Sequence, residues 1–238
     1  MGKFLYGIML QWKLDLRNKG VIVTYYVVPL VFFIFMGGIF TSIDPTAYKT
    51  LIPAMTVFGV TMGAMIGSPT PLVEVLRGEI KKGYRASGIP LWTIVANNFI
   101  SGFIHLFFMS LLIFFIAPVA FEAVVPKNIF IYFSTLALFI VASLSVATVL
   151  GLVVKSVSKL TMISQFIFLP SVMLSGIMFP ADMLPKALRG IGKILPATWG
   201  FEGLIKSKVE VTTILPLAVI FIAFTVISLW EINKLKVD

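Results

Sequence analysis

The sequence predicts an all-α membrane protein, with residues 1–238 forming a single transmembrane domain. Of the 238 residues, 59% are hydrophobic and only 12% are charged, and the mean hydropathy is +1.04. Soluble domains carry about 25% charged residues, so this chain has too little polar surface to cover a globule in water. The apolar residues form six long stretches rather than the short alternating segments of a transmembrane β-barrel. These observations exclude a soluble enzyme and a disordered protein.

The six apolar stretches are long enough to cross a membrane as helices. A hydrocarbon core about 30 Å thick needs about 20 apolar helical residues. No Asp, Glu, Lys or Arg lies inside the stretches away from their ends. The third stretch is over-long, and we expect Pro118 to mark the point at which it leaves the membrane. The predicted spans are residues 21–43, 51–73, 91–119, 129–154, 160–179 and 211–230.

An amphipathic helix is predicted ahead of the first span, over residues 3–19. Apolar residues from Leu5 to Leu16 share one helical face, whereas Gln11 and Asp15 share another face with lysines. This pattern is typical of a helix that lies in the membrane interface. Trp12 on the apolar face would anchor it there. We expect Gly20 to end the helix and allow the turn into the membrane.

The segment between the second and third predicted spans, residues 74–88, is the most charged stretch of the chain. Charges of both signs alternate along it, although a loop needed only for orientation would require a few lysines. We interpret it as a short surface helix that docks onto a soluble partner; a solvated connecting loop is the alternative. Its ionisable residues are Glu74, Arg77, Glu79, Lys81, Lys82 and Arg85.

The distribution of lysine and arginine predicts the orientation of the chain. Twelve of the nineteen basic residues fall on the side that holds the N-terminus. Because cytoplasmic loops carry the excess of basic residues, both termini are expected in the cytoplasm. Five of the seven residues on the other side lie in one segment, 180–208. Its apolar spacing allows it to lie in the interface with its lysines reaching towards water.

A polar stripe runs along the third predicted span. Asn97, Ser101 and His105 recur every four residues, with Asn98 beside them. At 1.5 Å per residue, His105 lies about 15 Å into the membrane. Polar groups at that depth face the bundle interior or a wet cavity, so the stripe either lines a substrate path or forms hydrogen bonds between helices. Gln165 of the fifth span is ambiguous in the same way.

His105 is not expected to relay protons, because no acidic residue lies inside the spans to pair with it. In the second span, Gly59, Gly63 and Gly67 form a ridge of small residues. Such a ridge favours close packing between helices.

The sequence lacks several motifs that would assign chemistry to the chain. It has no cysteine and one histidine, so neither a thiolate metal site nor a histidine-pair zinc site is expected. It lacks the phosphate-binding loop of ATPases and any catalytic constellation, so we expect no enzyme activity and no cofactor in this chain. The net charge of +9 is assigned to loop orientation rather than to nucleic acid.

Two segments near the C-terminus carry a resemblance to a known family. Residues 169–180 read Leu-Pro-Ser-Val-Met-Leu-Ser-Gly-Ile-Met-Phe-Pro, and residues 195–204 read Leu-Pro-Ala-Thr-Trp-Gly-Phe-Glu-Gly-Leu. They resemble the signature region of ABC-2 type permeases, the membrane subunits of type V ABC exporters. The order of elements is similar over the whole chain.

This resemblance implies a complex of several subunits in the cell membrane of a prokaryote. Residues 74–88 would hold a coupling helix that docks onto a separate ATP-binding subunit, where ATP and Mg²⁺ bind. A second permease chain would complete the transporter, and residues 180–208 would form a re-entrant outer hairpin. The apolar composition favours export of an amphipathic peptide, such as a toxin or bacteriocin, ahead of a hydrophobic drug or lipid. The alternative is an ATPase-independent channel or scaffold.

Overall fold

The computed structural model describes residues 3–43, 46–206, 208 and 210–237, and every regular element in this part of the chain is helical. Six helical segments are long and apolar enough to cross a membrane. The first span consists of α2 (Lys19–Ile22), η1 (Val23–Val27) and α3 (Val28–Ile43). The second consists of α4 (Leu51–Met62), η3 (Gly63–Gly67) and α5 (Pro69–Arg77), and the third is α7 (Trp92–Phe121). The other three are α8 (Ile129–Val153), α9 (Val157–Leu174) and α12 (Val211–Val237).

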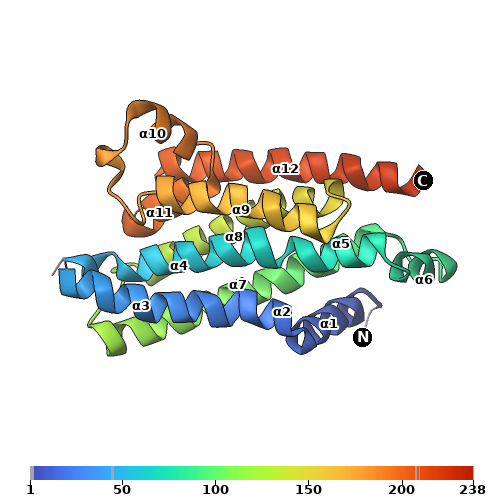
Figure 1. Ribbon diagram of the computed structural model, residues 1–238, viewed down its shortest axis with the longest axis horizontal. Coiled ribbons are helices and arrows are strands. Elements are labelled where there is room, and N and C mark those ends of the chain that lie inside the picture. The colour runs from blue at the N-terminus through green and yellow to red at the C-terminus, as the bar shows by residue number, and fades with distance from the viewer. Residues whose placement is uncertain (1–2, 44–45, 207, 209, 238) are drawn as a thin grey trace.

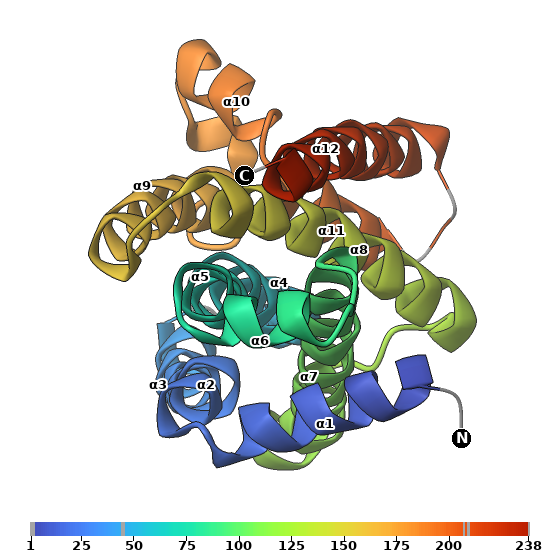
Figure 2. The ribbon, with the colours of Figure 1, turned by 90° about the vertical axis from the view of Figure 1, so that its right-hand side faces the viewer.

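The second span, α4 to α5, occupies the centre of the bundle and is the most deeply buried of the six. Figure 2, a view along the bundle, shows α3, α7, α8 and α9 around it. The first span and the last two bury only a small share of their residues, so most of their apolar surface is available to lipid or to a partner.

Short helices lie at both ends of the bundle (Figure 1). At one end are α1 (Lys3–Arg17), which lies across the spans, and α6 (Ile80–Ala86), together with both termini. At the other end are the turns η2 (Ala47–Lys49) and η4 (Ala181–Met183), the helix α10 (Lys186–Gly192) and α11 (Pro196–Lys206). Helix α11 turns back and packs on α8, α12 and α4, so the expected re-entrant hairpin is present.

The break between the N-terminal helix and the first span lies at Asn18, and the expectation that Gly20 forms it is wrong. Helix α1 ends at Arg17, and Gly20 lies inside α2. The side chain of Asn18 accepts hydrogen bonds from the backbone N–H groups of Gly20 and Val21, at 3.0 and 3.4 Å. Asn18 therefore caps α2, because its side chain satisfies donors that the first helical turn leaves free.

Several helices begin or end at other residues than the predicted spans, and the C-terminal ends of the second, third and fifth spans are examples. The second span continues to Arg77, which places Glu74 on α5 rather than in a loop. Helix α7 continues past Pro118 and ends at Glu122, whose left-handed backbone (φ 52°) stops it. The fifth span ends at Leu174 instead of residue 179 because Gly176 takes a φ of +94°. Hydropathy alone missed these ends, because charged residues interrupt the second span before its helix stops, whereas apolar residues continue beyond Leu174 in the fifth.

Candidate functional site

The polar stripe of α7 meets a matching stripe on α1. Gly7 of α1 lies against Asn97: a Cβ atom built on Gly7 would come within 2.6 Å of the Asn97 amide nitrogen. Gln11 and Asp15 follow at the same helical spacing, and the side chain of Asp15 reaches α7. Asp15 is only 4% exposed, whereas Leu5 on the apolar face is 59% exposed. The side of α1 that carries Gly7, Gln11 and Asp15 therefore packs on the bundle.

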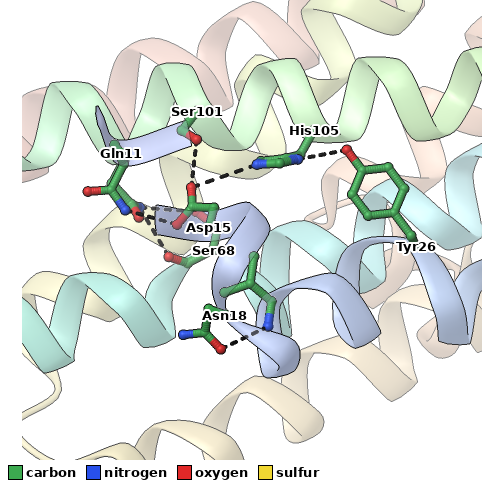
Figure 3. A network of polar contacts seen from close by, with 9 residues as sticks. Gln11, Asp15, Asn18, Tyr26, Ser68, Ser101 and His105 are labelled. Carbon is green, nitrogen blue, oxygen red and sulfur yellow. Dashed lines mark hydrogen bonds and ion pairs between the residues drawn. The ribbon is translucent and has the colours of Figure 1, made fainter. Parts of the chain in front are cut away.

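Asp15 is the centre of this interface (Figure 3). The hydroxyl of Ser101 donates a hydrogen bond to Asp15 Oδ2 at 2.6 Å, and the Gln11 amide donates to Oδ1 at 2.9 Å. His105 Nε2 lies 3.9 Å from the same Oδ2 atom. The prediction considered only acids inside the spans; α1, which lies outside them, supplies Asp15 as an acidic neighbour of His105.

Three aromatic side chains enclose the His105 ring, which is fully buried. Tyr25 stacks on it with ring centroids 5.2 Å apart, and Trp12 stacks at 6.3 Å. The Tyr26 ring meets it edge-on, and the Tyr26 hydroxyl is 2.6 Å from His105 Nδ1. Among the described atoms, His105 Nε2 has no hydrogen-bond partner, and its acidic neighbour is Asp15, at 3.9 Å.

Two π-helical segments pack together beside this histidine. Tyr25 and Tyr26 both belong to η1, and η1 contacts η3 of the second span. A Cβ atom on Gly63 of η3 would come within 2.9 Å of the Tyr25 ring. Single π-helical turns inside α-helices occur frequently at functional sites. Here η1 presents two successive tyrosines to one histidine.

Burial dominates the electrostatics of Asp15. It raises the pKa of the carboxyl group, because the charged form loses its hydration. The hydrogen bonds from Ser101 and Gln11 favour the carboxylate and act in the opposite direction, with smaller effects. In the described part of the chain, Asp15 forms no ion pair with lysine or arginine.

The other residues predicted to line a path are divided between buried and exposed positions. The Asn98 amide donates a hydrogen bond to the backbone oxygen of Ser68 at 3.1 Å. Asn97 is buried, and its Oδ1 atom has no hydrogen-bond partner among the described atoms. Gln165 lies on the exposed face of α9. The structure thus brings Asn97, Ser101 and His105 together under α1 and leaves Gln165 apart from them.

A cavity of about 690 Å³ continues the α1–α7 interface towards α6. It lies between the start of α1, the loop after α6 and the first turns of α7, and Asn97 is part of its lining. Four aromatic side chains give it an apolar wall: Phe4, Tyr6, Tyr84 and Trp92. The cavity therefore combines aromatic surface with one buried amide.

The charged segment forms a compact structure at the end of the central span. Its middle is the short helix α6, which follows α5 after a single turn. Arg77 donates a hydrogen bond to the backbone oxygen of Leu152 on α8, at 3.0 Å. Glu79 and Lys82 form an exposed ion pair at 2.9 Å. Lys81 is half-buried, whereas the other five of the six predicted coupling residues are exposed: Glu74, Arg77, Glu79, Lys82 and Arg85.

The glycines of the second span lie at close helix contacts. A Cβ atom on Gly59 would come within 2.6 Å of Met109 on α7. Gly63 packs on Leu106 and Tyr25, whereas Gly67 has ordinary contact distances of 3.5 Å. No three His, Asp or Glu side chains of the described residues gather closely enough to hold a metal ion.

Comparison with known proteins places this chain in a family. The family model described as ABC-2 type transporter matches residues 3–208, from the start of α1 to the segment before α12. The chain belongs to the ABC-2 type transporter family. No curated protein shows significant similarity to it.

ABC-2 membership gives the bundle a role. An ABC-2 chain is the membrane component of an ABC transporter and works with an ABC ATPase subunit. The six spans agree with this role and make the chain a multi-pass membrane protein. The resemblance noted in the sequence is therefore confirmed at the level of the family.

Sequence reasoning missed Asp15 as a partner of the α7 stripe. One signal was present: Gly7, Gln11 and Asp15 recur every four residues, as do Asn97, Ser101 and His105. Two polar stripes with one spacing can pack face to face along two helices. Tyr25 and Tyr26 left no comparable signal, because aromatic residues are common at this depth of a span.

Proposed function

We propose that this ABC-2 chain is the permease subunit of an ATP-driven exporter. The end of the bundle that carries α1, α6 and both termini faces the cytoplasm, and α6 is the coupling helix. Closure of two ATPase subunits on ATP and Mg²⁺ moves α6 and shifts the spans between inward-facing and outward-facing states. The chain itself carries out no hydrolysis.

The observation that carries this proposal is the placement of α6 at the end of the central span. The segment that contains it is the most charged of the chain and is mostly exposed. It continues directly from α5, and Arg77 ties the junction to α8. A force applied to α6 therefore reaches the buried centre of the bundle through a short and well-connected path.

The exposed face of α9 supports a second permease chain. Gln165 lies on this face among exposed apolar side chains that include Met162, Phe166 and Leu169. A polar amide inside a membrane span faces protein or a wet cavity in preference to lipid. A second copy or a homologous permease chain would cover Gln165 and place it at or beside the pathway.

The cavity beside α1 supports an apolar or amphipathic substrate. Its aromatic wall and the buried amide of Asn97 suit a molecule with an apolar body and a hydrogen-bonding group. We favour an amphipathic peptide, such as a toxin or bacteriocin, and next a hydrophobic drug or lipid. The position of the cavity at the proposed cytoplasmic end is consistent with entry from the cell interior.

The test is purification of the tagged chain with its ATPase subunit, followed by an ATPase assay in nanodiscs. The triple charge reversal Arg77→Glu, Glu79→Lys and Arg85→Glu is expected to abolish assembly or ATPase stimulation and to leave membrane insertion intact. Lys186→Glu on α10, at the opposite end, is the matched control and is expected to have no effect. Unchanged stimulation in the triple variant would overturn the assignment of α6. A chain that never associates with the ATPase would favour a channel or scaffold.

A further inference from the structure

The ATP-driven cycle proposed above gives no role to the buried pair of Asp15 and His105. We propose that these two residues form a proton-binding site, and that a proton bound there holds α1 on the transmembrane bundle. The inference rests on the α1–α7 interface itself and does not depend on the substrate.

The buried pair needs one bound proton to be electrically neutral. Asp15 is 4% exposed and His105 fully buried, so a carboxylate beside a neutral imidazole would leave one net negative charge in a site closed to water. An isolated buried charge is strongly destabilising. One bound proton makes the pair neutral overall, whether it sits on the carboxyl group or on the imidazole. The proton therefore belongs to the pair rather than to one residue.

No lysine or arginine of the described residues forms an ion pair with Asp15. On α1 the neighbour is the neutral amide of Gln11, and on α7 it is the hydroxyl of Ser101. From η1 the neighbours are Tyr25, which stacks on the His105 ring, and Tyr26, whose hydroxyl lies 2.6 Å from His105 Nδ1. The junction of η3 and α5 contributes only Ser68, which bonds to Tyr25 and Asn98. These groups are uncharged in the neutral pH range, so a proton is the compensating ligand.

The break at Asn18 allows α1 to separate from the bundle as a unit. Helix α1 ends at Arg17, and Asn18 takes an extended backbone (φ −84°, ψ 108°) before α2 begins. A break of this kind allows rotation with little loss of helical hydrogen bonds. When α1 leaves α7, Asp15 enters water and its pKa returns to the ordinary value. Docking and proton binding are therefore linked.

The direction of the linkage follows from the burial of Asp15. Burial raises its pKa in the docked state, so the docked state binds the proton more tightly than the undocked state. Docking is strongest below the ordinary carboxyl pKa of 3.8, and it weakens as the pH rises from there towards the raised pKa. Within this window the docking equilibrium changes by at most about tenfold per pH unit.

Spin-label distances measure this equilibrium on the complete chain. The protein has no cysteine, so labels can be placed at Leu5→Cys on α1 and Gly38→Cys on α3. Leu5 is exposed, and a Cβ atom on Gly38 meets no neighbour. In nanodiscs the distance distribution is expected to show one docked population at about pH 5 and a growing second population towards about pH 9.

Two variants separate proton binding from general effects of pH. Asp15→Asn cannot ionise, and it is expected to stay docked across the pH range. Asp182→Asn removes an exposed carboxyl group at the other end of the bundle. The distances in this variant are expected to change with pH as they do in the protein that carries only the two labels. If the distances in the doubly labelled protein without further substitution do not change with pH, the proposal is overturned, whatever the variants do. The same pH dependence in Asp15→Asn would also overturn it.

Discussion

Two short helices, α1 and α11, pack on long spans at opposite ends of the bundle, and they do so by different physical means. Helix α11 packs by shape: a Cβ atom on Gly200 would lie 2.5 Å from the Phe139 ring of α8. Its start is fixed by neutral hydrogen bonds, from Thr198 to the Gly192 oxygen and from the Trp199 indole to the Lys193 oxygen. Helix α1 also has a close glycine contact, between Gly7 and Asn97, but the centre of its interface is the buried carboxyl group of Asp15.

The difference shows which end of the molecule can respond to a change in pH. Close packing without charge has a stability that depends little on pH, so α11 is expected to stay fixed. An interface built around a buried acid changes its stability with every proton gained or lost. The substitutions below test this contrast, beginning with the largest expected effect.

Gly200→Val is expected to have the largest effect, because its side chain would overlap the ring of Phe139. Overpacking of this kind costs about 1–3 kcal/mol of stability. Thermal unfolding of the purified protein in nanodiscs measures it. Gly190→Val on α10 is the control, since a Cβ atom there meets no neighbour. Equal losses in both variants would show that α11 does not depend on close packing.

A rise in pH is expected to lower the thermal stability of the protein through α1. The raised pKa of Asp15 makes the docked state lose stability as the proton leaves, by at most about 1.4 kcal/mol per pH unit. Differential scanning calorimetry across the pH range should show a smaller slope for Asp15→Asn. Identical slopes would place the pH sensitivity outside α1.

Ser101→Ala is expected to have a moderate effect, about 1–2 kcal/mol, because it removes a hydrogen bond to a buried carboxyl group. That bond favours the carboxylate and lowers the pKa of Asp15. Its loss should weaken the docking of the ionised form, so a larger undocked population of α1 is expected at high pH, as read by spin-label distances. Ser110→Ala is the control, because Ser110 is equally buried and bonds only to Leu106 in its own helix. A shift of the same size in both would rule out a specific role for Ser101.

Lys206→Ala is expected to have the smallest effect. Lys206 and Glu210 form an ion pair at 2.6 Å at the end of α11, and both side chains are partly exposed. The hydrogen bond from Lys206 lowers the pKa of Glu210, but water screens pairs of this kind. No measurable change in the unfolding temperature is expected. A clear loss of stability would mean that α11 also relies on charge.

Much of the fold could be predicted from the sequence, because a span needs only length and apolar composition. The polar stripe of Asn97, Ser101 and His105 was also visible, because a period of four marks one helical face. The partner of that stripe was not. An amphipathic pattern around Asp15 is the same whether the polar face meets water or another helix, so only the packing of α1 on α7 reveals the buried acid.

The break at Asn18 was missed for a related reason. Glycine is a strong helix terminator by itself, whereas an Asn cap acts through hydrogen bonds that depend on the local geometry. The exposure of Gln165 was equally invisible, since composition does not say which face of α9 the bundle covers.

Hydrogen exchange of α1 and α11 in one sample tests the contrast between the two helices most directly. The protein in nanodiscs would be exchanged at about pH 5.5 and about pH 8.5, with protection factors corrected for intrinsic rates. We predict that α1 loses protection at the higher pH and that α11 keeps it. Equal protection of α1 at both values, or a parallel loss in α11, would contradict a proton-controlled α1.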